Sequence, residues 1–375
     1  MKPRDWLARF QAMGARMDAD LEALVSHESP SEDAERVSSL ARWVRDRLIE
    51  RGVAGETRTC PGRGDAVVAS VGGGTEGALL LGHLDTVWPA GTLEGIPFRV
   101  EGDRATGPGV FDMKAGIVVA MAALEALAAD GDGAAATLLL VPDEETRSHA
   151  SRGLLLDLAG RHRRALVLEP SLDGAAKVAR KGAGLFRLRF HGRAAHAGLE
   201  PDKGASALGE LARAVLFLEA LADPSKETTV VPTLAQSGSR VNVVPEEASL
   251  SVDARAWTGE EARRLETSIR GYPAADPRVV VEVEGGFDYP PLEPTPASQK
   301  LFVRAREIGL ELGQSLDAAR VGGASDGCLT AAAGVPTLDG LGPRGGGAHA
   351  RDEFVLLSDL PWRAALVASL AADLE

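Results

Sequence analysis

The chain has 375 residues, more than one hydrophobic core usually fills, so we expect two domains. Apolar residues make up 45% of the chain and charged residues 25%, which is typical of a folded globular protein. The formal net charge of −13 repels phosphate backbones and anionic lipid, which argues against nucleic acid and membrane surfaces as partners.

The sequence lacks the signals of a membrane or secreted protein. It contains no run of about 18 apolar residues, which a membrane-spanning helix would need. The N-terminus leads into an amphipathic pattern rather than a secretory signal, and Cys60 and Cys328 match no metal-binding or redox spacing. We therefore expect a cytoplasmic protein with two free thiols, although the mature form of a periplasmic protein would look the same.

In chain order, helical patterns come first and are followed by short apolar strands that alternate with helices. Residues 1–52 are expected to be helical. The next elements are strands at 67–71 and 78–81, a helix at 117–129, a strand at 136–141, a helix at 153–158 and a strand at 165–168. Near-continuous apolar strands between helices predict an α/β fold, in which a mixed, mostly parallel sheet carries helices on both faces.

The pattern changes between residues 180 and 286. The order becomes strand (185–190), helix (205–222), strand (228–236), strand (248–254), helix (260–270) and strand (279–284), which is the plan of a ferredoxin-like α+β domain. The α/β pattern then resumes with helices at 298–312 and 324–333, a strand at 335–339 and a closing helix at 358–374. We therefore expect one domain built from 1–179 and 287–375, with 180–286 inserted into it.

Polar side chains follow the apolar strands of the larger domain. Three strands are each followed by a histidine or a carboxylate, and two glycine-rich loops add an aspartate and a second histidine. Ligands of open α/β sheets bind beyond the carboxyl ends of the strands, so these side chains are expected to meet in one crevice. They are His83, Asp85, Asp112, Glu144, Glu145, Glu169 and His349.

This mixture of residue types suits a pair of metal ions. Imidazole nitrogen and carboxylate oxygen together favour zinc over magnesium or calcium. Two metals roughly 3.5–4 Å apart can share an aspartate, bind a bridging hydroxide and polarise a scissile carbonyl, while a spare carboxylate moves the proton to the leaving amine. The alternative for residues 143–145 is the acidic first turn of the following helix.

Four motifs carry a resemblance to a known family. They are Gly-His-x-Asp-Thr at 82–86, Gly-x-Gly-x-x-Asp-x-Lys-x-Gly at 107–116, Asp-Glu-Glu at 143–145 and Gly-x-x-His at 346–349. The chain resembles, over essentially its whole length, the dinuclear-zinc exopeptidase family that includes glutamate carboxypeptidase, succinyl-diaminopimelate desuccinylase, acetylornithine deacetylase and aminoacylase. The resemblance implies a metallohydrolase that cleaves an amide bond next to a free carboxylate, in a small peptide or an N-acyl amino acid.

The resemblance also implies a role for each residue of the larger domain. Two divalent ions, zinc or alternatively cobalt or manganese, would share Asp112. The peptide bond from Asp112 to Met113 would be cis. Asp85 would clamp the imidazole of His83, and Glu144 would act as general base and then general acid. The ligand sets would be His83, Asp112 and Glu169 for one metal, and Asp112, Glu145 and His349 for the other.

The inserted domain resembles the family's lid and dimerisation domain. His196, in the stretch 192–198, would donate a hydrogen bond to the developing oxyanion, and Asn242 with Arg255 would hold the substrate carboxylate. Lys177 aligns with a basic substrate-binding residue. Gly323 lies in a loop, 322–327, that resembles the desuccinylase.

One departure bears on specificity. The glutamate carboxypeptidase branch carries an arginine near the end of the lid, but residues 282–287 contain none. The alternative activities are a desuccinylase or an acetylornithine deacetylase, and, from another class, a homologue that binds metal or amides without turnover. We further expect a homodimer that covers exposed strand edges of the lid, with His196 reaching the partner's active site.

Overall fold

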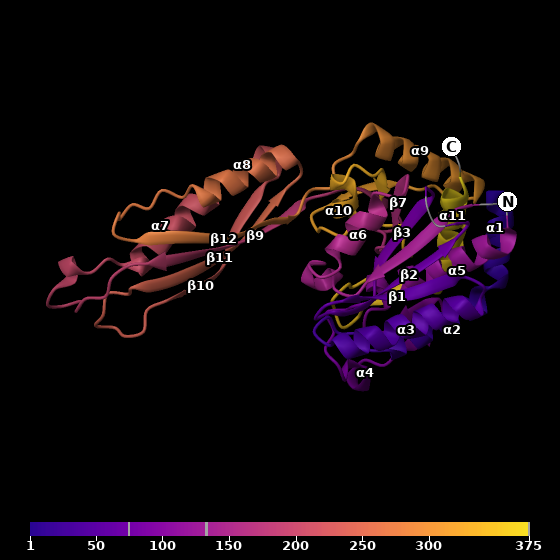
Figure 1. Cartoon of the computed structure of the whole chain (residues 1–375), viewed down its shortest axis with the longest axis horizontal. Helices are drawn as coiled ribbons and strands as arrows, with labels where there is room; N and C mark the ends of the chain where they lie inside the picture. Colours follow the sequence, from indigo (N-terminus) through magenta and orange to yellow (C-terminus); the bar gives the residue numbers. More distant parts are fainter. Residues whose placement is uncertain (74–75, 132–133, 374–375) are drawn as a thin grey trace. The chain divides into compact units, whose positions relative to one another are not determined.

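The computed structural model describes residues 1–73, 76–131 and 134–373, which form two compact units (Figure 1). The first unit consists of Met1–Val178, Pro294–Arg320 and Ser325–Glu375, and the second of Ala179–Glu293 and Val321–Ala324. The second unit is therefore an insertion in the first along the chain. The expected boundary at residue 286 falls within β12 (Val280–Tyr289), which continues the sheet of the second unit.

The central sheet of the first unit has the strand order β1-β2-β6-β3-β7-β14. Its β3–β6, β3–β7 and β7–β14 pairs are parallel, whereas β1–β2 and β2–β6 are antiparallel. The predicted mixed, mostly parallel sheet is thus confirmed. The strands are β1 (Ala54–Cys60), β2 (Gly64–Val71), β3 (Ala78–His83), β6 (Ala136–Val141), β7 (Arg164–Val167) and β14 (Thr337–Leu338).

Helices cover both faces of this sheet (Figure 1). As a result, every residue of β3 and β6 is buried. The expected closing helix included Leu374, which lies outside the described residues, and the helix as described ends at Ala372. The helices are α1 (Pro3–Ala12), α2 (Gly14–Ser26), α3 (Ala34–Glu50), α4 (Thr92–Gly95), α5 (Ala115–Asp130), α6 (Arg152–Ala159), α9 (Pro296–Glu311), α10 (Gly327–Ala332) and α11 (Leu360–Ala372).

A small antiparallel sheet, in the order β15-β16-β5-β4, lies beside the polar loops of the first unit. A further pair, β8 (Ala176–Arg180) and β13 (Ala318–Val321), forms where the chain passes between the units. The sequence patterns did not indicate these strands, since each is too short to show an alternation of its own. The small sheet consists of β4 (Arg99–Glu101), β5 (Arg104–Thr106), β15 (Gly345–Gly346) and β16 (Phe354–Leu356).

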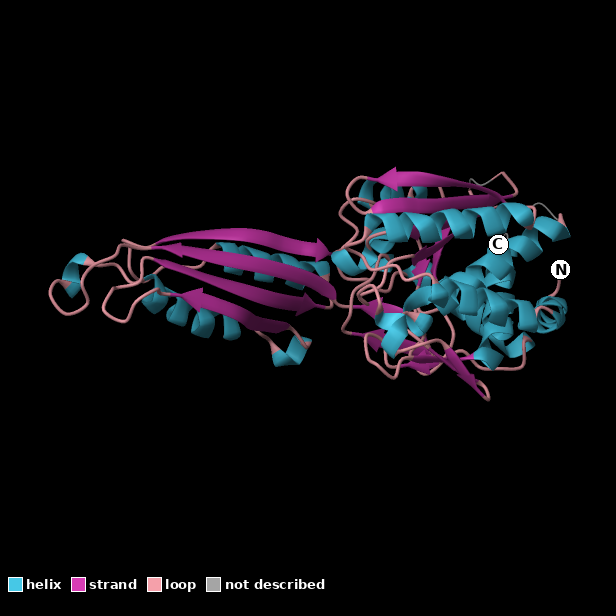
Figure 2. Ribbon diagram, turned by 90° about the horizontal axis from the view of Figure 1, so that it is seen from below, coloured by secondary structure: helices cyan, strands magenta, loops and turns pink. Residues whose placement is uncertain are grey.

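The second unit is the predicted ferredoxin-like arrangement. Its antiparallel sheet has the order β10-β11-β9-β12, and both of its helices lie on one face (Figures 1 and 2). That face encloses a separate hydrophobic core, which includes Phe186, Leu250 and Leu265. Besides β12, the elements are β9 (Gly182–His191), α7 (Ala207–Glu219), β10 (Thr229–Ser237), β11 (Glu247–Ala256) and α8 (Gly259–Arg270).

None of the helices in the described part of the chain is both long and apolar enough to cross a membrane. The two cysteines, Cys60 and Cys328, are buried and are not joined in a disulfide bond.

Candidate metal centre

Three neighbouring parallel strands deliver polar side chains to one edge of the central sheet. β3 ends at His83, β7 is followed by Glu169, and β6 is followed by the turn Glu144–Thr146. Since β6, β3 and β7 are adjacent and parallel, their carboxyl ends meet at the same edge. The acidic residues lie in this separate turn and not in the first turn of α6, which begins at Arg152.

The other two polar residues come from loops that the small sheet holds together. β5 leads into the loop that carries Asp112, and β16 follows the loop that carries His349. These strands pair directly, with Thr106 opposite Phe354, so the two loops leave the sheet side by side. The peptide bond from Asp112 to Met113 is cis, as the family resemblance implied.

Asp112 lies between the two histidines, and each of its oxygens faces one ring. Its Oδ1 is 3.3 Å from Nε2 of His83, and its Oδ2 is 3.3 Å from Nε2 of His349. Nε2 of His83 is also 3.5 Å from Glu169, and Nε2 of His349 is 3.1 Å from Glu145. The described residues therefore contain two clusters able to hold a cation, which share Asp112.

These spacings fit tetrahedral metal ions. Metal–ligand bonds of about 2.0–2.1 Å place two ligand atoms of a tetrahedron about 3.3–3.4 Å apart, close to the nitrogen–oxygen separations found here. The donors are imidazole nitrogen and carboxylate oxygen, the set that zinc, cobalt and manganese accept. The residues present therefore fit the ions that the family resemblance implied.

The electrostatics of the site also favour bound cations. Asp112 and Glu145 raise the pKa of His349 to about 10. Burial alone would lower the pKa of His83, but Asp112, Asp85 and Glu169 together raise it well above its usual value. Excess negative charge therefore surrounds both rings, and a divalent ion in each cluster would neutralise it.

Asp85 organises the site through more contacts than the expected clamp. Nδ1 of His83 lies 2.9 Å from the backbone carbonyl of Asp85 and 3.5 Å from its carboxylate, so the carbonyl is the ring's hydrogen-bond partner. The buried carboxylate instead accepts hydrogen bonds from the backbone N–H groups of Glu144 and Glu145, each at 3.1 Å. Ser31 donates a further bond to it at 2.7 Å. Asp85 thus fixes the backbone of both glutamates relative to His83.

The side chain of Glu144 is left available for proton transfer. Among the described residues it has no hydrogen bond or ion pair, although its neighbour Glu145 pairs with His349. Burial, followed by the charge of Glu169, raises the pKa of Glu144 well above its usual value. A half-buried carboxylate without a fixed partner among the described residues, beside two clusters able to hold cations, suits a proton shuttle.

Two glycines bring neighbouring backbone close to Glu169. A Cβ atom at Gly116, in α5, would lie 2.1 Å from the carbonyl oxygen of Leu168. A Cβ atom at Gly342 would lie 2.7 Å from the carbonyl oxygens of both Leu168 and Glu169. These approaches leave no room for a side chain at either position.

In the second unit, His196 and Asn242 lie together. The backbone N–H of Ala197 donates to the carbonyl of Asn242 at 2.9 Å, and His196 forms a bridge with Val243. Nδ1 of His196 accepts N–H groups from Gly198 and Leu199, at 3.2 and 3.1 Å. The hydrogen of the neutral ring is therefore on Nε2, which makes this exposed side chain a hydrogen-bond donor.

Arg255 lies at the other end of the same unit. Asn242 precedes the start of β11 and Arg255 is near its end, so about 27 Å of strand separates Glu247 from Arg255 at roughly 3.4 Å per residue. A single copy of the second unit therefore cannot bring the side chains of Asn242 and Arg255 to the same substrate carboxylate. Nε and Nη2 of Arg255 donate to Asp253 at 2.7 and 2.8 Å, whereas Nη1 has no acceptor among the described residues.

The remaining candidates lie near the chain crossings. Lys177 is in β8, where its backbone exchanges hydrogen bonds with Asp339 at 2.7 and 3.3 Å. Gly323 belongs to the short segment Val321–Ala324 of the second unit, and its carbonyl accepts a bond from Arg180 at 3.2 Å.

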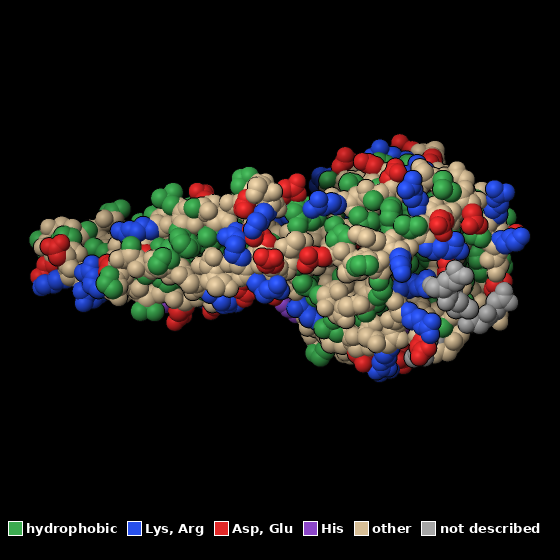
Figure 3. Space-filling view, turned by 90° about the horizontal axis from the view of Figure 1, so that it is seen from above, with side chains coloured by type: hydrophobic (Ala, Val, Ile, Leu, Met, Phe, Trp, Pro, Cys, Tyr) green, Lys and Arg blue, Asp and Glu red, His purple; other side chains and the backbone are tan. Residues whose placement is uncertain are grey.

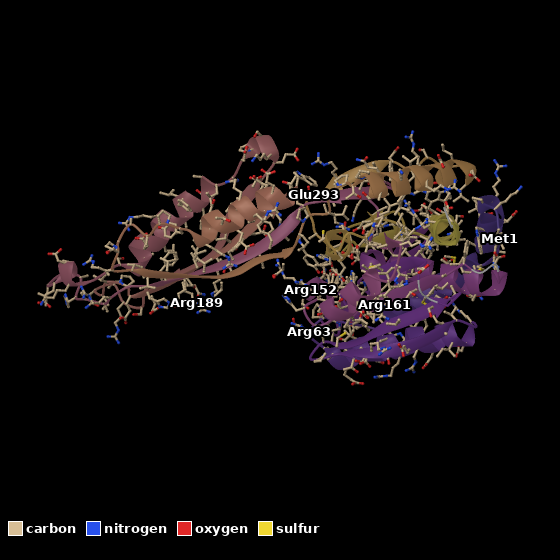
Figure 4. The ribbon with its side chains drawn as sticks, turned by 45° about the horizontal axis from the view of Figure 1, so that its top comes forward. Met1, Arg63, Arg152, Arg161, Arg189 and Glu293 are labelled. Atoms are coloured by element: carbon tan, nitrogen blue, oxygen red, sulfur yellow. The ribbon has the colours of Figure 1, made fainter. Side chains whose placement is uncertain are left out.

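In the stretch 282–287, which contains no arginine, acidic residues form ion pairs. Glu284, on β12, pairs with Arg189, which Figure 4 labels on β9, at 3.3 Å. Glu282, also on β12, has a carboxylate oxygen 3.6 Å from Nε2 of His191 on β9. The end of the second unit therefore carries acidic side chains held in ion pairs, and residues 282–287 contain no arginine.

Comparisons with known proteins agree with this geometry. The sequence profile of peptidase family M20/M25/M40 matches residues 79–373. The chain belongs to this family. It is therefore a hydrolytic enzyme of the peptidase and amidohydrolase kind, and the family is metal-dependent.

Individual members are similar over most of the chain. Carboxypeptidase G2 of Pseudomonas sp. (strain RS-16) is 32% identical over 369 residues, which cover 94% of this chain and 88% of that protein. Acetylornithine deacetylase of Myxococcus xanthus is 30% identical over 60% of this chain and 63% of its own length. The aminopeptidase PepT of Bacillus cereus shares the fold, with a TM-score of 0.80 at 20% identity, over 96% of this chain and 98% of its own.

Two contacts of this M20-family site were not indicated by the sequence. Ser31 reaches Asp85 from a segment 54 residues earlier, and Glu353 accepts bonds from the loop that carries Asp112. The only signal for Glu353 is its place in the His349 loop, directly before a buried strand. Neither residue belongs to a motif that could be recognised without the fold.

Asp85 gives the first testable prediction. Replacing it with asparagine leaves at least one of the Glu144 and Glu145 N–H groups without an acceptor, because an amide nitrogen cannot accept. We expect Asp85→Asn to lower the free energy of unfolding by about 1–3 kcal/mol, measured by chemical denaturation of the apoprotein. The control Asp46→Asn, at an exposed carboxylate paired with Arg45, should change it by less than about 0.5 kcal/mol. Equal effects in the two variants would contradict this view of Asp85.

Proposed function

We propose that the protein is a dinuclear zinc hydrolase that cleaves an amide bond next to a free carboxylate, as a carboxypeptidase or an N-acyl-amino-acid amidohydrolase. One observation carries the proposal: Asp112 directs one carboxylate oxygen to each of two histidine–carboxylate clusters. His83, Asp112 and Glu169 would hold one ion, and Asp112, Glu145 and His349 the other. When bound, the ions supply Lewis-acid polarisation of the scissile carbonyl and lower the pKa of the attacking water.

Glu144 would carry the proton in this reaction. As general base its carboxylate takes a proton from the attacking water, and as general acid it then delivers that proton to the departing amine nitrogen. No described residue bonds to its carboxylate, so both oxygens are available, and Asp85 holds its backbone in place. His196 would donate Nε2–H to the carbonyl oxygen as that oxygen gains negative charge.

The substrate would be gripped by its carboxylate. Asp253 occupies one side of the Arg255 guanidinium, and the outer Nη1 edge remains for a second carboxylate. Lys177, Asn242 and Gly323 are further candidates for substrate contact. A desuccinylase or acetylornithine deacetylase is the second candidate function, which the resemblance of the 322–327 loop and the similarity to acetylornithine deacetylase favour.

A homodimer would complete the site. His196 and Asn242 lie at one end of the second unit and Arg255 at the other, so all three can meet one substrate only if they come from two chains. Ala179, where the chain enters this unit, is close to the Arg255 end, because Arg255 pairs with Ala183. We therefore propose that His196 and Asn242 serve the partner's site and that Arg255 comes from the other chain of the pair.

The second copy would pack against β10 and the adjacent helix α7. β10 is an edge strand and carries exposed Val231 and Leu234, the latter 70% exposed, while α7 exposes Leu208 and Leu216. Figure 3 shows one face of this unit, on which hydrophobic side chains lie among charged ones. Pairing two copies about a two-fold axis would cover both the edge and these side chains.

The metal proposal predicts about two zinc ions per chain, measured by elemental analysis of freshly purified protein. Glu144→Ala should keep the metals but lose roughly 10²–10⁴-fold in kcat, because it removes only the proton shuttle. His349→Ala should instead lower the occupancy of one site. Protein that holds no metal and gains no activity with zinc, cobalt or manganese would overturn the proposal.

The substrate proposal predicts that amidated or esterified analogues are poor substrates. Arg255→Ala should reduce kcat/KM for a free-carboxylate substrate by roughly 10–100-fold, since a charged hydrogen bond contributes about 1.5–3 kcal/mol. The same substitution should leave kcat/KM for an amidated analogue almost unchanged. Arg187→Ala, an exposed arginine on the same face of the sheet, is the matched control.

The same substrate panel tests the missing lid arginine. With Glu282 and Glu284 in its place, we expect no strong preference for glutamyl substrates. A glutamyl substrate that exceeds all others by orders of magnitude would contradict this expectation.

The dimer proposal predicts complementation between two inactive chains. When Glu144→Ala and His196→Ala proteins are mixed and allowed to exchange subunits, half of the hybrid's sites regain both residues. Activity of the mixture should rise well above that of either variant alone. A fully active monomer, shown by light scattering at assay concentration, or the absence of any recovery after verified exchange, would rule the arrangement out.

A further inference from the structure

Glu353 is a buried carboxylate next to the metal centre, with only 2% of its surface exposed. Its Oε1 accepts the backbone N–H groups of Phe111 and Asp112, both at 2.9 Å. Its Oε2 accepts the backbone N–H of Gly109 at 3.0 Å and the indole N–H of Trp88 at 2.9 Å. All four contacts are hydrogen bonds from neutral N–H donors to the carboxylate. Hydrogen bonds of this kind are stronger when the acceptor is charged.

These bonds join the two loops that carry ligands of the second cluster. Glu353 lies in the loop that follows His349, and three of its donors belong to the loop that ends in Asp112. The strand pairing between β5 and β16 reaches only as far as Thr106 and Phe354. Beyond that point, Glu353 ties the Asp112 loop to the His349 loop directly.

The charge of Glu353 is compensated without occupying its oxygens. Lys114 is buried and interacts electrostatically with Glu353, while its ammonium group donates to the carbonyl of His27 at 2.8 Å. Both oxygens of the carboxylate therefore remain free for the four N–H donors. A buried carboxylate with this many backbone donors has little freedom to move.

We propose that Glu353 is a positioning residue that sets the place of Asp112 relative to His349, and thereby the metal affinity of the Asp112–Glu145–His349 cluster. The inference rests on the proposed function of that cluster as a metal site. Asp112 also serves the first cluster, but the four hydrogen bonds of Glu353 go to Trp88 and to the loop that ends in Asp112, and not to His83 or Glu169. Loss of Glu353 should therefore weaken one metal equivalent far more than the other.

Glutamine in place of Glu353 is the sharpest test. It keeps the shape of the side chain, but one end becomes an NH₂ group that faces two N–H donors and cannot accept from either. Loss of a hydrogen bond that orients a metal ligand typically lowers metal affinity by about 10–100-fold. We expect Glu353→Gln to bind one equivalent of Zn²⁺ at least about tenfold more weakly than the unaltered protein and to keep the other within about threefold.

The measurement is a competitive titration of the full-length apoprotein with Zn²⁺ in the presence of a chromophoric chelator. Co²⁺ absorption spectra follow the same two equivalents independently. Glu353→Asp provides a second variant if the glutamine variant does not fold, because the shorter acid keeps the charge but cannot reach both pairs of donors. Thermal unfolding of each apoprotein shows which variants are folded.

Two matched controls separate positioning from general stability. Glu210, in the second unit, is a fully buried carboxylate that accepts the hydroxyl of Tyr272 and the backbone N–H groups of Ala275 and Asp276. Glu210→Gln should lower the unfolding temperature but leave both Zn²⁺ affinities unchanged. Trp88→Phe removes only the side-chain donor, so it should change neither affinity by more than about threefold.

Each outcome distinguishes this inference from the proposed function. If the unaltered protein binds no Zn²⁺, the proposed function fails first. If it binds two equivalents and the folded Glu353 variants bind both with normal affinity, or lose both equally, the positioning role is wrong. If Glu210→Gln lowers metal affinity as much as Glu353→Gln does, the effect reflects stability alone.

Discussion

The repulsion between buried carboxylates is the constraint on which the rest of the first unit depends. Asp112, Glu145 and Glu169 face one another around two imidazoles, with Asp85 and Glu144 close by. Like charges this close raise one another's pKa values unless cations offset them. The raised pKa values of His83 and His349 show that the two rings lie in this negative field. The site is therefore built to favour positive charge at two defined points.

Backbone hydrogen bonds hold these charges in place. Asp85 binds the N–H groups of Glu144 and Glu145, and Glu353 binds those of the Asp112 loop, so carboxylates outside the two clusters fix the chain beside those within them. The parallel strands supply the coarse placement, because adjacent carboxyl ends meet at one edge of the sheet. The small sheet brings the Asp112 and His349 loops together. The central sheet, the small sheet and the backbone hydrogen bonds thus place the side chains of the two clusters with increasing precision.

The sequence predicted the parts of this arrangement that follow from strand order. His83, Glu145 and Glu169 could be placed together because each follows an apolar strand long enough to recognise. Asn242 and Arg255 could not be placed, since a spacing of thirteen residues does not reveal that most of a strand separates them. Glu353 and Ser31 were missed for a related reason. Their partners are distant in the chain. Glu353 accepts backbone N–H groups, which leave no pattern in the sequence, and Ser31 donates its hydroxyl to Asp85 from 54 residues away. The short strands β5 and β16, which align the two ligand loops, show no periodicity of their own.

Gly116 and Gly342 extend this constraint beyond the charged residues. Each lies so close to the carbonyl of Leu168 or Glu169 that a methyl group would overlap it. A side chain at either glycine would push aside the backbone that presents Glu169, although neither glycine has any chemistry to contribute. In a library of variants selected for turnover, these two positions should be as intolerant of change as the residues of the two histidine–carboxylate clusters. Mutational sensitivity alone would therefore mark helix α5 and the loop after β14 as part of the active site.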